Sequence, residues 1–278
     1  FEFDVNVKII QKKDWYWDMS VNGYTYANKM LNLPDEYKVS GMPNGNQRIY
    51  EGKDIYRWEM RQFAGLDEKG NSLWYMDRDL TDGEGNVVGV EKVTTGDATE
   101  ATQYLLEKSA LPDFTGGLNT TLRWKSLDLT IMTNFQFGGY GYDYDFSAFS
   151  SANFPMNRLK DYADAWNPET GKGSAPIWNT NDSNINASSD RFLISKTYFN
   201  LRNITLGYTF PANWMSKIGI KSVRVYFACD NVFFASKRKG YDPRTSMGGQ
   251  GATVALNSVD GTYYSPIRTT SVGLNINF

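Results

Sequence analysis

The sequence predicts an all-β protein, and more specifically part of a large transmembrane β-barrel. The first observation is at residues 269–278, where apolar and small polar side chains alternate strictly. Such alternation is typical of a β-strand with one apolar and one polar face. Comparable segments recur along the whole sequence, and the links between them alternate between short turns and long loops. We therefore expect about nine antiparallel strands of a barrel that crosses a bilayer.

The composition permits this fold and excludes several functions. The 278 residues carry a net charge of -2 and no basic stripe, which argues against nucleic acid as a partner. A mean hydropathy of -0.51 does not contradict a barrel, because alternating strands average out on hydropathy scales. The sequence contains no histidine and a single cysteine, Cys229, so histidine-based catalysis and an intrachain disulfide are excluded. We expect no enzymatic activity, no cofactor and no metal.

The N-terminal part is predicted to contain four strands. Residues 1–9 and 15–21 alternate with consistent apolar faces and are joined by a tight turn, which predicts a hairpin. Residues 27–52 lack periodicity and contain several Pro and Gly residues, so we expect a long loop. Two shorter alternating segments, 56–61 and 73–76, complete this part.

The C-terminal part is predicted to contain five strands. Residues 118–124 and 127–137 lie on either side of a short turn, and the second of them shows the clearest alternation in the chain. Residues 203–210, 223–228 and 269–278 follow, separated by links that range from a short segment to long loops rich in Gly, Tyr, Asn and Ser.

The lengths of the links distinguish a barrel from a soluble sandwich. An outer-membrane barrel has short periplasmic turns and long extracellular loops, whereas a sandwich has no reason to segregate its links. The predicted links alternate between short ones at 11–13, 67–71, 125–126 and 211–221 and long ones at 27–52, 78–112, 138–195 and 235–266. In this orientation the aromatic residues expected at the periplasmic rim are Trp15, Trp17, Trp124, Phe210 and Phe278.

Nine strands cannot form a complete bacterial barrel, which has an even number, and an open sheet would aggregate through its edges. We therefore expect residues 1–278 to form one unit, the C-terminal portion of a larger barrel. Two alternatives stay open from the residues alone. One is a soluble carbohydrate-binding β-sandwich, which the aromatic residues and the low hydropathy favour. The other is an outer-membrane adhesin or enzyme barrel, although the lack of histidine leaves few catalytic groups.

Several motifs carry a resemblance to a known family. Residues 112–119 with 124–129 are similar to the P-x-F-x-G-G-x-N … Y-K-x-F-D-L hairpin of the SusC/RagA family of TonB-dependent transporters from Bacteroidetes. Residues 198–208 resemble its Y-x-R-L-K-N-I-T-L-G-Y strand, with Asn200 in place of the usual Arg. Residues 223–243 resemble its R-V-Y … Q-N-L-F … G-Y-D-P run, with Asp230 where Gln is commoner, and the end at 266–278 also matches. The motifs cover residues 105–278. The first hundred residues resemble the family only in their general pattern and carry none of these motifs.

The resemblance implies a 22-stranded barrel in the bacterial outer membrane, filled by an N-terminal plug domain. It also implies a SusD-like surface lipoprotein as partner and uptake of oligosaccharides or peptides powered through TonB. On this reading the plug and the segment that contacts TonB lie upstream of this sequence, and outer-membrane lipid surrounds the barrel.

Substrate contacts are expected on the outer loops and on the lumen-facing sides of the strands. The candidates are Tyr140, Tyr142, Tyr144, Trp166, Trp178, Arg123, Asn134 and Gln136. Flat aromatic faces suit sugar rings and peptide side chains, and neighbouring polar groups can orient them. The alternative is structural: the tyrosines would form the outer aromatic girdle, the tryptophans would pack within loops, and the lumen residues, with Asp128 and Asn203, would contact the plug or water.

Overall fold

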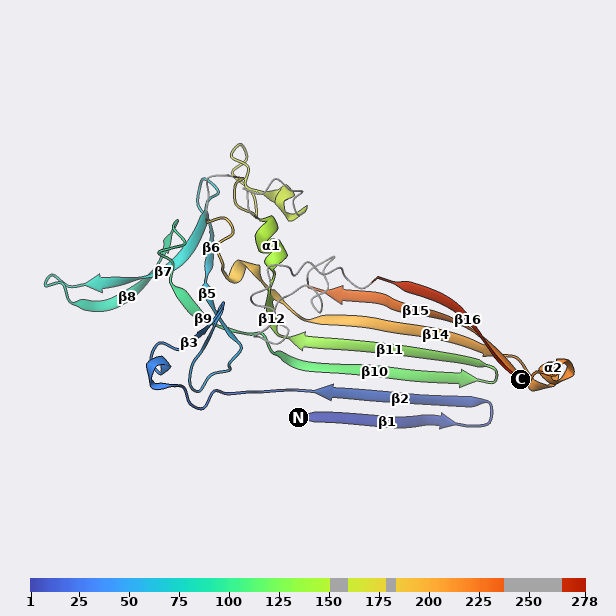
Figure 1. Cartoon of the computed structure of the whole chain (residues 1–278). Helices are drawn as coiled ribbons and strands as arrows, with labels where there is room; N and C mark the ends of the chain where they lie inside the picture. Colours follow the sequence, from blue (N-terminus) through green and yellow to red (C-terminus); the bar gives the residue numbers. More distant parts are fainter. Residues whose placement is uncertain (151–159, 179–183, 238–266) are drawn as a thin grey trace.

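The computed structural model describes residues 1–150, 160–178, 184–237 and 267–278. Its main feature is an antiparallel sheet of seven long strands, in the order β1-β2-β10-β11-β14-β15-β16, which lie side by side in Figure 1. The strands are β1 (Glu2–Gln11), β2 (Trp15–Tyr24), β10 (Pro112–Trp124), β11 (Leu127–Gly138), β14 (Tyr198–Thr209), β15 (Ser222–Ser236) and β16 (Thr269–Asn277).

The pairing register aligns apolar residues into rows that cross the whole sheet. One such row consists of Trp17, Leu122, Leu129, Leu206, Phe227 and Val272, each directly opposite the next. A slip of one residue in any strand would move its apolar side chains to the other face, so the pattern fixes the register. Leu206 is 47% and Val272 75% exposed. An apolar face of this length that remains open is the surface a barrel presents to lipid.

Aromatic side chains mark both ends of this apolar face. Near the short links, the Trp15 and Trp124 rings lie 5.7 Å apart, and both belong to the set of aromatic residues expected at this end of the strands. At the opposite end, the Phe114 ring stacks at 6.3 Å on Phe3 and at 6.1 Å on Phe135. Ten residues of β10 separate the two bands, which at about 3.3 Å per residue and a tilt of about 40° gives about 25 Å. This matches the roughly 25 Å apolar band of an outer-membrane barrel.

Two of the nine predicted strands do not belong to this sheet. Segment 56–61 forms β5 (Arg57–Arg61) and segment 73–76 lies in β7 (Ser72–Thr81), and both strands pair in smaller sheets. Their alternation was interpreted correctly as strand, but the apolar face of β5 is buried in the loop core and does not face lipid. Alternation alone cannot distinguish these two environments. The described residues therefore contribute seven strands to the barrel sheet, and the 67–71 turn lies within an outer loop.

Segments that were predicted as unstructured loops contain several small sheets. One joins β3 (Met42–Asn44), β4 (Gln47–Ile49), β5 and β9 (Gln103–Ser109); another joins β6 (Phe63–Leu66), β7 and β8 (Val87–Thr95); a third joins β12 (Tyr140–Tyr142) and β13 (Leu193–Ser195). The helices are α1 (Tyr144–Phe149) and α2 (Ala212–Met215), with 3-10 turns at Asp35–Tyr37, Lys160–Asp164, Asp190–Phe192 and Ser216–Ile218. Within the described ranges, no helix has the length and apolarity needed to cross a membrane.

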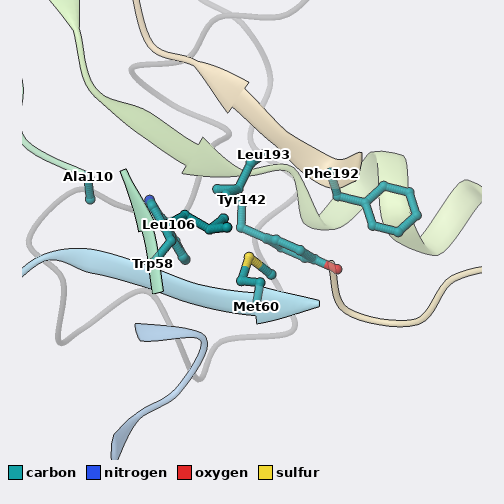
Figure 2. Packing of buried hydrophobic residues seen from close by; sticks show 7 residues of the cluster. All are labelled: Trp58, Met60, Leu106, Ala110, Tyr142, Phe192 and Leu193. Carbon is teal, nitrogen blue, oxygen red and sulfur yellow. The ribbon is translucent and has the colours of Figure 1, made fainter. Parts of the chain in front are cut away.

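The segregation of links by length holds with these revised boundaries. The short links of the main sheet are residues 12–14, 125–126 and 210–221, the last of which carries α2. The long links are 25–111, 139–197 and 237–268, and the described parts of the first two leave the sheet at its other end (Figure 1). The first two long links pack together through a common core, seen in Figure 2, made of Trp58, Met60, Leu106, Ala110, Tyr142, Phe192 and Leu193. The described parts of these two links, called the outer links below, thus form a folded assembly at one end of the sheet.

Candidate functional site

The polar face of the sheet carries an ion pair that spans three strands. Arg224 on β15 donates from Nε to Asp128 Oδ1 at 3.1 Å and from Nη2 to Asp128 Oδ2 at 2.5 Å. Asp128 lies on β11, so the guanidinium crosses the intervening strand β14 at Gly207. A Cβ at Gly207 would lie 2.3 Å from Arg224 Nη2 and 2.6 Å from Asp128 Oδ1. The missing side chain at this position is what permits the pair.

Polar contacts continue from this pair toward β2. Tyr16 donates to Asp18 Oδ2 at 2.8 Å, and the Arg123 guanidinium lies 5.0 Å from the centre of the Tyr16 ring. Arg123 is itself directly opposite both Tyr16 and Asp128 in the register. Both signs of charge therefore line the short-link end of this face. Such a surface can bind a polar partner of complementary charge.

Asn134, predicted as a substrate contact, lies toward the long-link end of the same face. It accepts a hydrogen bond at 2.8 Å from Asn200, whose side chain is fully buried, and donates to the Tyr198 hydroxyl at 3.3 Å. Gln136 donates to the Lys196 carbonyl at 3.2 Å. Both predicted residues thus also join β11 to β14 and the segment before it. Asn200, which replaces the usual Arg of the family motif, is part of this network.

The three predicted tyrosines belong to the loop assembly and do not form the outer girdle, where the stacked rings are phenylalanines. Tyr142 is 3% exposed within the core of Figure 2, and its hydroxyl donates to Ser147 Oγ at 3.1 Å. Burial raises the pKa of the Tyr142 phenol. The Tyr144 ring packs edge-on against Tyr142 at 4.8 Å, and the Tyr140 carbonyl accepts from Trp58 Nε1 at 3.2 Å. Of the three tyrosines, Tyr140 and Tyr144 are half-buried.

The two predicted tryptophans have different surroundings. The Trp166 ring covers the backbone of Gly70, where an added Cβ would lie 2.2 Å from Trp166 Cγ. This contact joins two separate outer links and leaves the ring half-buried. Trp178 is 42% exposed on the loop surface. Trp178 is therefore the better placed of the two for contact with a large ligand.

Lys196 is a buried cation that sequence reasoning missed. Its side chain is almost entirely enclosed, and Nζ donates to the Ala110 carbonyl at 3.3 Å. Burial lowers the pKa of the ammonium to about 8. The contact ties the segment before β14 to the link before β10. No local pattern marks Lys196 as buried, because its neighbours come from segments far away in the sequence.

A cavity of about 410 Å³ opens where β2 and β10 meet their outer links. Its lining consists of Thr25, Tyr26, Ala27, Asn28, Asp54, Ser109, Leu111, Pro112 and Asp113. Sequence reasoning did not find it, because the lining comes from three separate segments without a common motif. Elsewhere in the described part of the chain, no group of three or more acidic, Cys or His side chains is arranged to hold a metal.

The sequence of the chain is similar to those of several TonB-dependent receptors. No family model matches the chain. It is 25% identical over 299 residues to TonB-dependent receptor P3 and 24% identical over 292 residues to receptor P26, both of Formosa agariphila. It is also 25% identical over 284 residues to TonB-dependent receptor SusC of Bacteroides thetaiotaomicron. Each similarity covers the whole chain, which spans 28%, 29% and 26% of the length of these relatives.

Solved structures agree on the fold. The structure of the RagAB peptide transporter superposes on this chain with a TM-score of 0.74 at 24% sequence identity. The match covers 100% of this chain and 29% of the transporter chain. The "open-open" state of the RagAB peptide importer gives 0.72 at 22% identity, over 100% and 28%. The chain is therefore similar in sequence to TonB-dependent receptors, SusC among them, over its whole length, and its sheet has the fold of part of an outer-membrane β-barrel. This match excludes the soluble sandwich, and the relatives are receptors and not enzymes.

Proposed function

We propose that this relative of the SusC-type receptors forms part of the barrel wall of a transporter that imports oligosaccharides or peptides across the outer membrane. The observation that carries the proposal is the two-faced sheet. Its apolar rows are open toward lipid, while its opposite face holds the Asp128–Arg224 pair and further polar groups. A polar inner surface together with large folded outer loops is typical of barrels that conduct or bind polar solutes.

The two ends of the polar face suit different partners. We expect the charged end near Arg123 and Arg224 to contact a plug domain from elsewhere in the polypeptide, through which TonB would act. We expect the folded outer links to meet a SusD-like surface lipoprotein. The name RagAB describes a peptide transporter of related fold, which supports peptides as one substrate class. Oligosaccharides are the other class, which the resemblance of the sequence motifs to the SusC/RagA family implies.

Among the predicted substrate contacts, accessibility favours some over others. Tyr140 and Tyr144 are half-buried and Trp178 is 42% exposed, so these three are the aromatic candidates for direct contact. Tyr142 is enclosed in the loop core and would position its neighbours. Trp166, half-buried against Gly70, would likewise act through packing, and Arg123, Asn134 and Gln136 would contact the plug or a passing substrate from the barrel wall.

The experiment is uptake by whole cells that produce the full-length polypeptide that contains this chain. We expect labelled peptide or oligosaccharide to accumulate inside the cells, and accumulation to stop when a protonophore collapses the proton-motive force that drives TonB. Surface binding that continues with no energy-dependent uptake would instead support the adhesin alternative and contradict the proposal.

A further inference from the structure

We propose that the cavity beside Asp54 and Asp113 is a binding site for a positively charged group, an ammonium or guanidinium, on the imported substrate. This inference rests on the proposed uptake function and adds the chemistry of one subsite. A volume of about 410 Å³ falls within the roughly 300–1,000 Å³ of small-molecule sites. The cavity can therefore hold one side chain or one sugar residue of a longer substrate.

The charges that line the cavity have one sign. Of the nine described residues that line it, Asp54 and Asp113 are ionisable acids and none is Lys or Arg. Lys29, Lys53 and Lys108 adjoin the lining residues in sequence, but none of them lines the cavity, and Lys108 Nζ lies 4.0 Å from Asp190 Oδ2. Asn28, Thr25 and Ser109 add neutral polar groups. A cation is thus the ligand whose charge this lining complements.

Asp54 is held in a fixed orientation before any ligand arrives. Its Oδ1 accepts from Asn28 Nδ2 at 2.7 Å and from the backbone N–H of Tyr56 at 2.9 Å. Asn28 is fixed in turn, because its Oδ1 accepts from the backbone N–H of Ile55 at 2.9 Å. Among the described residues, Asp54 Oδ2 takes part in no hydrogen bond. A preorganised carboxylate with a free oxygen loses little conformational entropy when it binds a donor.

Asp113 enters the lining through an irregularity of the sheet. The pairing of β10 with β11 shifts between Pro112 and Phe114, so Asp113 is the extra residue of a β-bulge. Bulges are common beside functional sites, where they redirect a side chain. The Asp113 carboxylate lies over Gly138, where an added Cβ would be 2.0 Å from Oδ2, and no hydrogen bond within the described chain engages it. The lining therefore includes two carboxylates, that of Asp54 from the first long link and that of Asp113 from the start of β10.

The exposed ring of Tyr26 completes the arrangement. Tyr26 also lines the cavity and is 55% exposed, so its face is available to a ligand. Aromatic rings attract ammonium and guanidinium groups through their quadrupole. The same ring would stack against a sugar carrying an amino group. Both a lysine-containing peptide and an amino sugar present the chemistry that this cavity selects.

The test is calorimetric binding to the purified full-length protein in detergent with matched probes. One pair is N-acetyl-Ala-Lys-Ala-amide and its norleucine counterpart, which differ by the ammonium; the other pair is glucosamine and glucose. We expect the charged member of at least one pair to bind roughly tenfold more tightly, because hydrogen bonds between charged groups are the strong ones. Which pair shows the preference identifies the source of the ammonium.

The variants Asp113→Asn and Asp54→Asn should each reduce this preference to about twofold or less. Asp113 makes no hydrogen bond that folding needs, so Asp113→Asn separates binding from stability. Asp14→Asn, an exposed carboxylate in the β1–β2 turn, is the matched control and should keep the full preference. Equal affinity for both members of each pair, no binding of any probe, or a preference that survives in both cavity variants would overturn the proposal. A failure of the transport function is distinguishable, because it would abolish uptake in cells, whereas a failure here leaves uptake intact without a charge preference.

Discussion

Replacement of Gly207 by alanine gives the sharpest test of the polar face. The Cβ of the variant would occupy space within 2.3 Å of Arg224 Nη2 and 2.6 Å of Asp128 Oδ1. Both are terminal atoms of side chains that can rotate, so the strands themselves need not move. We expect the guanidinium to swing away from the carboxylate, and the link across β14 to break, with the sheet otherwise intact.

The expected magnitude follows from the nature of the pair. It makes two charge-assisted hydrogen bonds between side chains that are 29% and 22% exposed. Hydrogen bonds to charged groups contribute about 1.5–3 kcal/mol, and partial solvent exposure places this pair at the lower end. Alanine is also favoured over glycine within a strand by roughly 0.5–1 kcal/mol. The net destabilisation by Gly207→Ala should therefore be about 1 kcal/mol.

The decisive comparison is a double-mutant cycle. In a background of Asp128→Asn with Arg224→Gln no ion pair remains, so Gly207→Ala should be neutral or slightly stabilising there. The assay is the rate at which the full-length barrel loses its folded gel mobility on heating in detergent, where 1.4 kcal/mol corresponds to a tenfold change. Gly89→Ala in β8 is the control, because its Cβ would meet only Leu80 Cδ1, at 3.8 Å. An equal cost of Gly207→Ala in both backgrounds would refute the reasoning.

Three other changes probe other parts of the molecule. Leu206→Arg places a charge on the lipid-facing row and should cost about 2–4 kcal/mol, seen as reduced recovery of folded protein from membranes; unchanged recovery would contradict a lipid-facing position. Trp58→Ala empties the core of the outer links, and a cost of about 3–5 kcal/mol should make them sensitive to limited proteolysis while the sheet stays resistant; equal protection of the links would show that this core does not hold them. Burial lowers the pKa of Lys196 to about 8, so the unfolded chain binds more protons above that pH, and stability gains from this group as pH rises from about 8 toward 10. Lys196→Met should remove that pH-dependent gain in a thermal unfolding series, and identical pH profiles of the two proteins would argue against a buried ammonium.

The strands of the barrel sheet could be predicted from the sequence because their two faces differ so strongly. Apolar and polar side chains alternate from Leu127 to Phe137 with exceptions only at Met132 and Thr133, and β11 forms over this range. Trp58 and Met60 show the same alternation in β5, yet both side chains are buried under the outer links. A lipid-facing row and a loop core impose the same pattern on a single strand. What distinguishes them is the packing of the apolar face, because Leu106 and Phe192 cover that face in β5 from positions far away in sequence.

The site was less predictable than the fold for a related reason. The run of tyrosines from Tyr140 to Tyr144 stood out by composition, but Tyr142 is needed to fill the core beside Phe192. Asp54 and Asp113 carry no local signal, since a cavity arises only when three segments meet. Gly207 could have suggested the Asp128–Arg224 pair, because a glycine between two polar positions of neighbouring strands leaves room for long side chains.

The most direct measurement of the central claim is the sidedness of the links in living cells. In a Cys229→Ser background, Val88→Cys places a thiol on the β7–β8 hairpin of the first long link, where residue 88 is 65% exposed. Asn213→Cys places one in α2 of the short link between β14 and β15, also at an exposed position. A membrane-impermeant maleimide should label the first variant on intact cells, and the second only after the outer membrane is permeabilised. Labelling of both on intact cells, or of Asn213→Cys alone, would contradict a barrel whose long links face outward.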